Sequence, residues 1–193
     1  MTESVWTTFG KTSGGGGSGG NFLRPSKLKD KQSVKFRILG SPVEGFERWT
    51  TENKPVSIAL GEPWPAGHEW RPGKEGNPKM FASMPVWNYA EEAVQVLTFT
   101  QATIREQLSS WATHEEWGDP TGYDLTLKRT GTTKEDTKYA LVPSLPKPCP
   151  EVAVAAWDAV LKAGFDLNEL FTGGNPFAPT GNSKPENDAD IPF

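Results

Sequence analysis

The stretch Val34-Lys35-Phe36-Arg37-Ile38-Leu39 decides the fold class, because apolar and basic side chains alternate along it. In an extended strand, side chains at alternate positions point to opposite faces of the sheet. The apolar residues at even positions are therefore predicted to face a core, and Lys35 and Arg37 to form a basic outer face. Gly40-Ser41-Pro42 then ends the run. The stretch predicts a sheet whose first strand is basic on one side.

Similar runs elsewhere in the chain predict further strands, separated by turns that contain Gly, Asn and Pro. We expect these strands at residues 45–50, 55–60, 79–89, 93–100, 122–129 and 137–142. Apolar residues recur at helical spacing in 101–114 and again in 151–163, where Gly164 ends the pattern. Short strands with one helix inserted before the last hairpin predict a mainly β fold. We expect an OB-fold-like Greek-key barrel with an inserted helix and a second, C-terminal helix.

The two ends of the chain differ in composition from its middle. Residues 1–20 end in a run of Gly and Ser, and residues 172–193 begin with a linker rich in Gly, Pro and Asn. Such segments bury too little apolar surface to fold, so both tails are predicted to be disordered around one domain at 21–171. Trp6 and Phe9 are exceptions in the N-terminal arm. They dock on a neighbouring protomer, stack on a base, or belong to an unstructured end.

Composition excludes several classes of protein. No apolar run approaches the roughly 20 residues that a membrane span requires, and the N-terminus lacks the order of a signal peptide. We therefore expect a cytoplasmic protein with no membrane contact. Cys149 is the single cysteine and is expected to be an inert thiol. With only His68 and His114 beside it, no zinc site of the Cys/His type can form, and we expect neither metal nor cofactor.

Charge divides unevenly along the chain, whose formal net charge is −4. Residues 151–193 contain seven acidic residues against Lys162 and Lys184, so they carry −5 and residues 1–150 carry +1. Within 21–90, eleven basic residues outnumber seven acidic ones. A basic N-terminal half with an acidic C-terminus suits a protein that holds a polyanion with one part and repels or competes with it through the other. A solvated surface of mixed sign is the plainer alternative.

Tryptophan is abundant, with eight residues, and four of them (49, 64, 70 and 87) lie among basic side chains. Aromatic rings beside cationic side chains suit the binding of single-stranded nucleic acid. Each base that stacks on a ring contributes about 1–3 kcal/mol to binding, and Lys or Arg binds the phosphates. The Pro-rich segment Gly61–Pro78 is expected to be a long loop that walls the groove. The predicted strand-binding residues are Arg37, Arg48, Trp49, Lys54, Trp64, Trp70, Arg71, Lys74 and Lys79.

Other aromatic residues have a different or an open assignment. Phe81 and Trp87 either stack on bases or face the barrel interior, depending on whether Met84-Pro85 introduces a bulge. Trp111 and Trp157 lie in the two predicted helices and are assigned to packing. Trp117-Gly118-Asp119-Pro120 is expected to be a turn in which Asp119 caps backbone amides.

The last eight residues, Glu186-Asn187-Asp188-Ala189-Asp190-Ile191-Pro192-Phe193, place acidic side chains ahead of an apolar tip. Such a peptide offers a basic pocket with an apolar floor three things: charge, a ring and a terminal carboxylate. We predict a partner-binding tip formed by Asp188, Asp190, Ile191, Pro192 and Phe193. A frayed tail that only aids solubility is the plainer alternative.

Seven segments follow one another in a characteristic order and spacing: Lys79–Tyr89, Val94–Leu97, Thr100–Ile104, Trp117–Pro120, Gly122–Leu125, Lys128–Gly131 and Thr137–Tyr139. Together they resemble the central part of tailed-bacteriophage single-stranded DNA-binding proteins, and the last four residues resemble the tip of bacterial and phage members. The resemblance covers roughly residues 21–145 and the tip. It implies an OB-fold that coats single strands during phage DNA replication, recombination and repair. It also implies that the tip recruits partners such as a polymerase, helicase, primase or recombinase.

Two features depart from that family. Some relatives carry a zinc-binding insertion, for which this chain has no ligands. Ala189 interrupts the acidic run of the tip, which predicts weaker electrostatic competition between tail and DNA while the Ile191-Pro192-Phe193 anchor stays intact.

No catalytic motif accompanies these features. Two-metal sites need several carboxylates around ions about 4 Å apart, but Glu91-Glu92 is predicted in a turn and Glu115-Glu116 at a helix end. The chain has no phosphate-binding Gly-rich loop with Lys-Ser/Thr, and neither histidine has a nucleophile motif beside it. We therefore predict a non-enzymatic protein that binds single-stranded DNA, with RNA left open. The alternative is an adaptor of the replication or recombination machinery whose barrel binds a protein and meets DNA incidentally.

Overall fold

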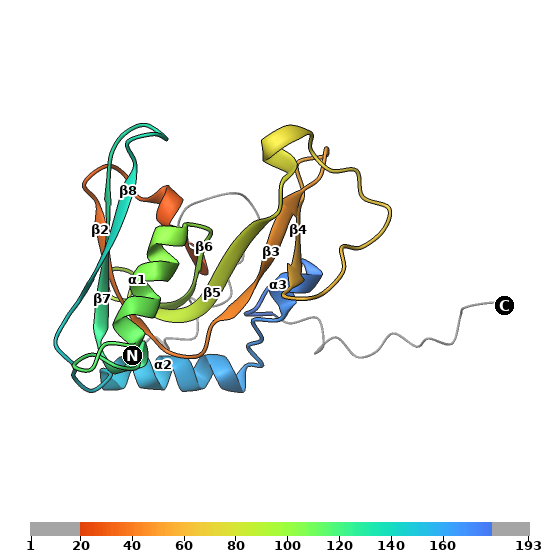
Figure 1. Ribbon diagram of the computed structural model, residues 1–193. Coiled ribbons are helices and arrows are strands. Elements are labelled where there is room, and N and C mark those ends of the chain that lie inside the picture. Colours follow the sequence, from red (N-terminus) through yellow and green to blue (C-terminus); the bar gives the residue numbers. More distant parts are fainter. Residues whose placement is uncertain (1–19, 179–193) are drawn as a thin grey trace, which may run out of the picture.

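The computed structural model describes residues 20–178 of the chain, which form a mainly β structure (Figure 1). One mixed sheet of eight strands contains β1 (Phe22–Leu23), β2 (Ser33–Ile38), β3 (Val43–Trp49), β4 (Pro55–Ala59), β5 (Lys79–Asn88), β6 (Ala93–Phe99), β7 (Asp124–Thr130) and β8 (Lys138–Pro143). The α-helices of this part of the chain are α1 (Ala102–Ala112), α2 (Glu151–Lys162) and α3 (Glu169–Thr172). Short 3-10 turns are η2 (Pro25–Lys27), η3 (Gly73–Gly76) and η4 (Pro120–Gly122).

Strand β5 is the centre of the sheet. Its first half pairs with β3 and its second half with β2, while β6 runs along its other edge. The order β1-β6-β5-β2-β7-β8 continues to both sides, and β4 pairs only with β3. β1 pairs with β6 in parallel and the other pairs are antiparallel. The β3–β4 hairpin therefore stands on the opposite side of the molecule from β2, β7 and β8 (Figure 1).

The predicted mainly β fold and its elements are confirmed. Each predicted strand appears within two residues of its expected limits, and both predicted helices form. The short β1 and α3 were not predicted. The folded part also continues past residue 171, because Pro176 is buried and Phe177 packs on Phe165 with ring centroids 5.1 Å apart. The N-terminal arm at 1–19 and the acidic tip lie outside the described residues.

The first core cluster is built as the alternation in β2 predicts. Val34, Phe36 and Ile38 are buried, and Leu125 and Leu127 of β7 join them. Helix α1 closes this cluster with Ile104 and Leu108 at helical spacing. Strand β5 is buried along most of its length, which leaves Phe81 and Trp87 each 3% exposed. Neither ring belongs to this first cluster, which takes Ala82, Met84 and Val86 from the other face of β5. Phe81 lies 6.0 Å from the Phe171 ring of α3, and Trp87 belongs to a second cluster. Both are therefore packing residues outside the first core cluster, and both predicted alternatives, base stacking and a place in the barrel interior, are wrong.

A second cluster lies against helix α2, which runs along the base of the sheet (Figure 1). Trp87 and Val94 of the sheet meet Ala153 and Val160 of the helix there. Trp157 packs edge-on against Phe165 at a centroid distance of 5.1 Å. The assignment of Trp157 to packing is confirmed, as is that of Trp111, which packs edge-on against Trp117 at 5.8 Å.

Strand β8 is an edge of the sheet, and helix α1 covers it through one side chain. Gln107 accepts a hydrogen bond from the Leu141 amide at 2.8 Å and donates one to the Tyr139 carbonyl at 3.2 Å. The Gln107 amide thus takes the place of a neighbouring strand at two backbone groups. Edge strands need such protection because their unpaired groups are a template for other chains.

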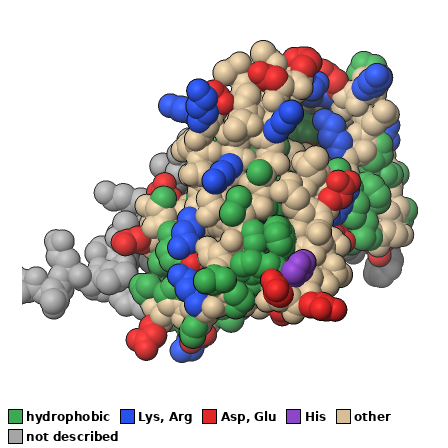
Figure 2. All heavy atoms as spheres, turned by 60° about the vertical axis from the view of Figure 1, so that its left-hand side comes forward, with side chains coloured by type: hydrophobic (Ala, Val, Ile, Leu, Met, Phe, Trp, Pro, Cys, Tyr) green, Lys and Arg blue, Asp and Glu red, His purple; other side chains and the backbone are tan. Residues whose placement is uncertain are grey.

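Among the helices of residues 20–178, none combines the length and apolar character needed to cross a membrane. The face turned toward β2, β7 and β8 mixes basic and acidic side chains and carries an apolar patch in its lower part (Figure 2). Its basic side chains are dispersed between acidic ones.

Candidate nucleic-acid interface

The β3–β4 hairpin and the Gly61–Pro78 loop form one unit. β3 pairs with β4 up to Trp49 and Pro55, and the loop then folds back over the hairpin end. The Arg71 amide donates to the Trp49 carbonyl at 3.0 Å, and the Thr51 amide donates to the Glu69 carbonyl at 2.9 Å. These bonds bring residues about 20 positions apart onto the same end of the molecule.

Two arginine–tryptophan pairs occupy this end. The guanidinium carbon of Arg48 lies 4.5 Å from the ring centroid of Trp70, and that of Arg71 lies 5.1 Å from the ring centroid of Trp49. Each pair joins one residue of β3 to one of the loop. Such cation–π contacts contribute about 0.5–1 kcal/mol at exposed positions and more when they are desolvated. All four side chains are half-buried, so both rings and both cations still reach the surface.

Further contacts fix the rings in place. Trp64 packs edge-on against Trp70 with centroids 5.2 Å apart, and His68 lies 5.5 Å from the same ring. The Trp49 indole donates to Glu47 at 2.9 Å, and Arg48 Nε donates to the Gly76 carbonyl. We call Arg48, Trp49, Trp64, Trp70 and Arg71 the hairpin cluster. Ring contacts hold Trp70, a hydrogen bond to Glu47 holds Trp49, and the loop backbone holds Arg48.

Lysines surround the hairpin cluster. Lys54, Lys74 and Lys79 are exposed. Lys54 pairs with Glu52 at 2.8 Å, which lowers the pKa of Glu52 and raises the pKa of Lys54. In the part of the chain that the structure describes, Lys74 and Lys79 form no ion pair. Their charges are available to an anion from outside.

Arg37 is the exception among the predicted strand-binding residues, and its expected place on an exposed basic face is wrong. Its side chain is 1% exposed, and Nε donates to Asp124 at 2.8 Å. Nη1 donates to the carbonyls of Thr121 and Lys147, each at 3.1 Å. The outer side of β2 is therefore covered at this point by η4 and by the chain segment that follows β8.

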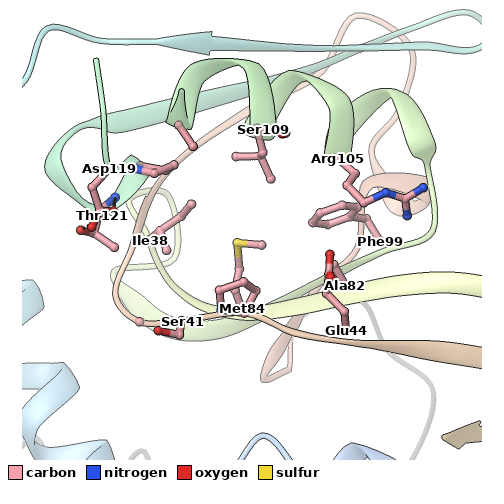
Figure 3. A pocket seen from close by; sticks show the side chains of 15 residues that line it. Ile38, Ser41, Glu44, Ala82, Met84, Phe99, Arg105, Ser109, Asp119 and Thr121 are labelled. Carbon is pink, nitrogen blue, oxygen red and sulfur yellow. Dashed lines mark hydrogen bonds between the residues drawn. The ribbon is translucent and has the colours of Figure 1, made fainter. Parts of the chain in front are cut away.

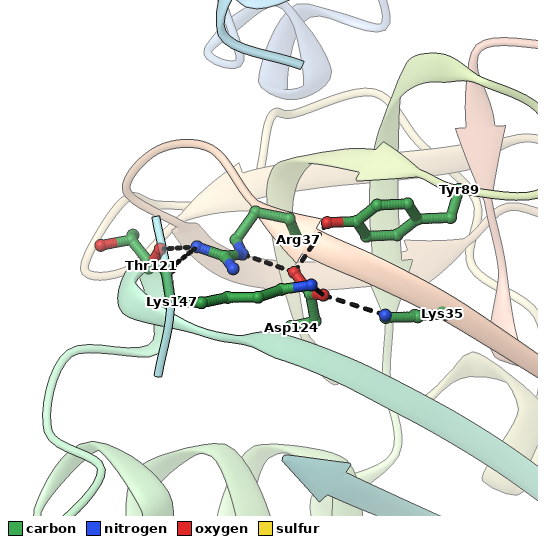
Figure 4. Close-up of polar contacts among 6 residues, drawn as sticks. All are labelled: Lys35, Arg37, Tyr89, Thr121, Asp124 and Lys147. Atoms are coloured by element: carbon green, nitrogen blue, oxygen red, sulfur yellow. Dashed lines mark hydrogen bonds and ion pairs between the residues drawn. The ribbon is translucent and has the colours of Figure 1, made fainter. Parts of the chain in front are cut away.

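Asp124 is the centre of the network in Figure 4. Its side chain is fully buried. Lys147 Nζ lies 2.8 Å from Oδ2, and Lys35 Nζ lies 3.1 Å from the same oxygen. The Tyr89 hydroxyl donates to Oδ1 at 2.8 Å. Burial by itself would raise the pKa of Asp124, but the four donors around it outweigh burial and hold the pKa well below the ordinary carboxyl range. Burial and the bond to this carboxylate raise the pKa of Tyr89.

A cavity of about 340 Å³ lies between helix α1 and the sheet (Figure 3). Its floor is apolar, with Met84 at the centre and Ile38 and Phe99 beside it. Arg105 and Glu44 line one side, and Asp119 lies on the other. Asp119 accepts a hydrogen bond from the Thr121 amide at 2.9 Å, which confirms its predicted capping role. None of the predicted strand-binding residues lines this cavity.

Candidate metal ligands do not gather in residues 20–178, where no group of three or more His, Cys, Asp or Glu side chains could hold an ion. Cys149 is half-buried beside the α2 cluster, and burial raises the pKa of its thiol. A raised pKa lowers the fraction of the reactive thiolate.

The structure thus brings eight of the nine predicted strand-binding residues to the hairpin, the loop and the adjoining start of β5, and separates Arg37 from them. Sequence reasoning missed Lys147, whose position in a Pro-rich segment after β8 gave no signal of a partner far away in the chain. The predicted partner-binding tip lies outside the described residues. No family model, curated protein or solved structure matches this chain.

Proposed function

We propose that this protein binds single-stranded DNA at the hairpin cluster. The observation that carries the proposal is the pair of interleaved Arg–Trp contacts, at 4.5 Å and 5.1 Å, with exposed lysines beside them. Aromatic rings offer every base a stacking surface, and cations next to them bind the phosphates. Because one face of each ring meets a guanidinium, a base stacks on the other face or displaces the guanidinium toward a neighbouring phosphate.

The order of the strands supports an OB-fold for this site. β2 lies between β5 and β7, β6 extends β5, and β8 extends β7. Helix α1 is inserted between β6 and β7, and β6 does not pair with β8. A partly open five-stranded barrel of this kind binds oligonucleotides with the loop between its first two strands. In this chain that connection, from β2 to β5, contains the β3–β4 hairpin and the Gly61–Pro78 loop.

In this proposal the protein coats single strands during DNA replication, recombination and repair, and it is not an enzyme. The tip formed by Asp188, Asp190, Ile191, Pro192 and Phe193 recruits replication or recombination proteins. A chain that ends at Ala178 tests the tip, since Pro176 and Phe177 belong to the folded part. It should keep its affinity for single strands and lose its partners in a pull-down from host extract.

The binding proposal is tested by titrating intrinsic Trp fluorescence with oligo-dT and with a duplex of matched length, each at low and high salt. We expect strong quenching by oligo-dT that salt weakens, because stacking and counterion release act together. Duplex should quench little, since its bases are already stacked. Absence of quenching and of binding to either DNA would reject the proposal and favour the protein adaptor.

Gly76→Ala is expected to weaken oligo-dT binding by about 1–3 kcal/mol, the contribution of one stacked base. A Cβ at this position would lie 1.6 Å from the Arg71 carbonyl oxygen, so the loop has to open and Arg48 loses its bond to the Gly76 carbonyl. Fluorescence titration measures the affinity. Gly122→Ala is the matched control, because a Cβ there meets no atom within 4 Å. Equal affinities of both variants and the wild type would show that loop closure does not shape the site.

A further inference from the structure

The charges around Asp124 do not balance. One carboxylate faces three cations, with Arg37 Nε and Lys147 Nζ at 2.8 Å and Lys35 Nζ at 3.1 Å. None of the ion pairs within residues 20–178 brings a second carboxylate to these cations. Two positive charges therefore remain without a counter-ion (Figure 4).

Neutralising Asp124 does not require both lysines. Oδ1 already accepts hydrogen bonds from Arg37 and Tyr89, each at 2.8 Å, so the buried arginine supplies the counter-charge by itself. Lys35 and Lys147 both approach Oδ2, which places two ammonium groups near each other. Like charges at such separations repel, and an anion on their solvent side removes that repulsion.

The two lysines also have donors to spare. An ammonium group has three N–H donors, and the side chains of Lys35 and Lys147 are 43% and 46% exposed. Lys35 is held in place because its Nζ lies 4.8 Å from the ring centroid of Tyr89. Nη2 of Arg37, the buried third cation of the network, has no hydrogen-bond partner in the described part of the chain. The site is therefore rich in donors and positive charge, and it is fixed by a buried network.

We propose that Lys35 and Lys147 form a phosphate-binding site. The phosphate comes from the backbone of a bound single strand, in which case the site rests on the proposed function, or it is free inorganic phosphate. Phosphate oxygens accept from both ammonium groups and supply the missing negative charge. Since β2 and β7 lie across the molecule from the β3–β4 hairpin (Figure 1), only a strand long enough to cross the barrel reaches both sites.

The test compares Lys35→Gln/Lys147→Gln with the control Lys27→Gln/Lys162→Gln, which removes two exposed lysines elsewhere. Affinity is measured against salt for oligo-dT of roughly 5 and roughly 25 nucleotides, near the limits of known site sizes. We expect the test pair to lower the salt slope for the long strand by about 0.7 for each lost phosphate contact and to leave the short strand unchanged. Lys35→Arg/Lys147→Arg should keep the wild-type slope, since it keeps both charges.

An unchanged slope in the test pair, while the wild type binds the strand, would overturn the strand contact without touching the proposed function. Failure of the wild type to bind single strands would instead reject the proposed function. In either case, the melting temperature in inorganic phosphate and in chloride at equal ionic strength tests whether the site binds free phosphate. A rise in phosphate that the wild type shows and the test pair lacks supports the site with free phosphate, and equal melting in both salts overturns it.

Discussion

Replacing Asp124 by Asn is expected to lower the free energy of unfolding by about 3–5 kcal/mol, the usual cost of removing one partner of a buried ion pair. The substitution leaves Arg37, which is 1% exposed, without its counter-charge in the interior. Urea denaturation followed by Trp fluorescence measures the change. Asp158→Asn alters an exposed carboxylate on α2 and serves as the control. A loss below about 1 kcal/mol would contradict a structural role for the pair.

The same network predicts how stability depends on pH. The pKa of Asp124 is lower in the folded chain than the ordinary value of about 3.9 expected after unfolding. Its contribution is therefore fully present above the unfolded pKa and is lost as the pH falls through the folded one. Wild-type stability should decline below about pH 4 more steeply than that of Asp124→Asn. Parallel curves for the two proteins would contradict the ionised, paired state of Asp124.

Removing both paired rings, as Trp49→Ala/Trp70→Ala, is expected to weaken oligo-dT binding by about 2–6 kcal/mol, since each ring supports about one stacked base. Even the lower value corresponds to a roughly 30-fold rise in Kd. Two half-buried rings at the end of the hairpin contribute little to either core cluster, so the fold should persist. Fluorescence anisotropy of labelled oligo-dT measures Kd without relying on the lost tryptophans.

The control for this pair is Trp157→Phe, because Trp157 packs in the α2 cluster away from the hairpin. It should bind oligo-dT as the wild type does. If the double variant also kept wild-type affinity while the wild type bound strongly, the hairpin cluster would be excluded as the stacking surface, and the strand would have to bind elsewhere.

The sequence predicted the elements because their signals are local. Alternation in 34–38 predicts the strand β2 and the face that it buries, and helical spacing predicts α1 and α2. Alternation did not reveal what covers the other face. The chain that buries Arg37 includes Lys147, 110 positions away, so its burial depends on a contact that no local pattern encodes. The nearly continuous burial of β5 is easier to read from the sequence, because strands covered on both faces lose the alternation of polar and apolar residues.

The candidate site shows the same limit. Composition placed tryptophans and cations in one region of the chain, but it could not pair Arg48 with Trp70 or Arg71 with Trp49. Those pairs depend on the return of the Gly61–Pro78 loop to the hairpin, where Thr50 and Trp70 form an isolated bridge. The Lys35–Lys147 pair likewise follows from folding alone, because a long-range contact through Asp124 brings them together.

The contacts of Gln107 have a consequence wherever copies of this protein come close together, as the proposed function requires. Neighbouring copies then collide often, and an unprotected edge strand would let one copy pair with the next through backbone hydrogen bonds. Gln107 forms hydrogen bonds with the Tyr139 carbonyl and the Leu141 amide, so these two backbone groups of β8 are not available to pair with another chain. If the proposed coating of single strands is correct, neighbouring copies can assemble and separate again without joining through the β8 edge.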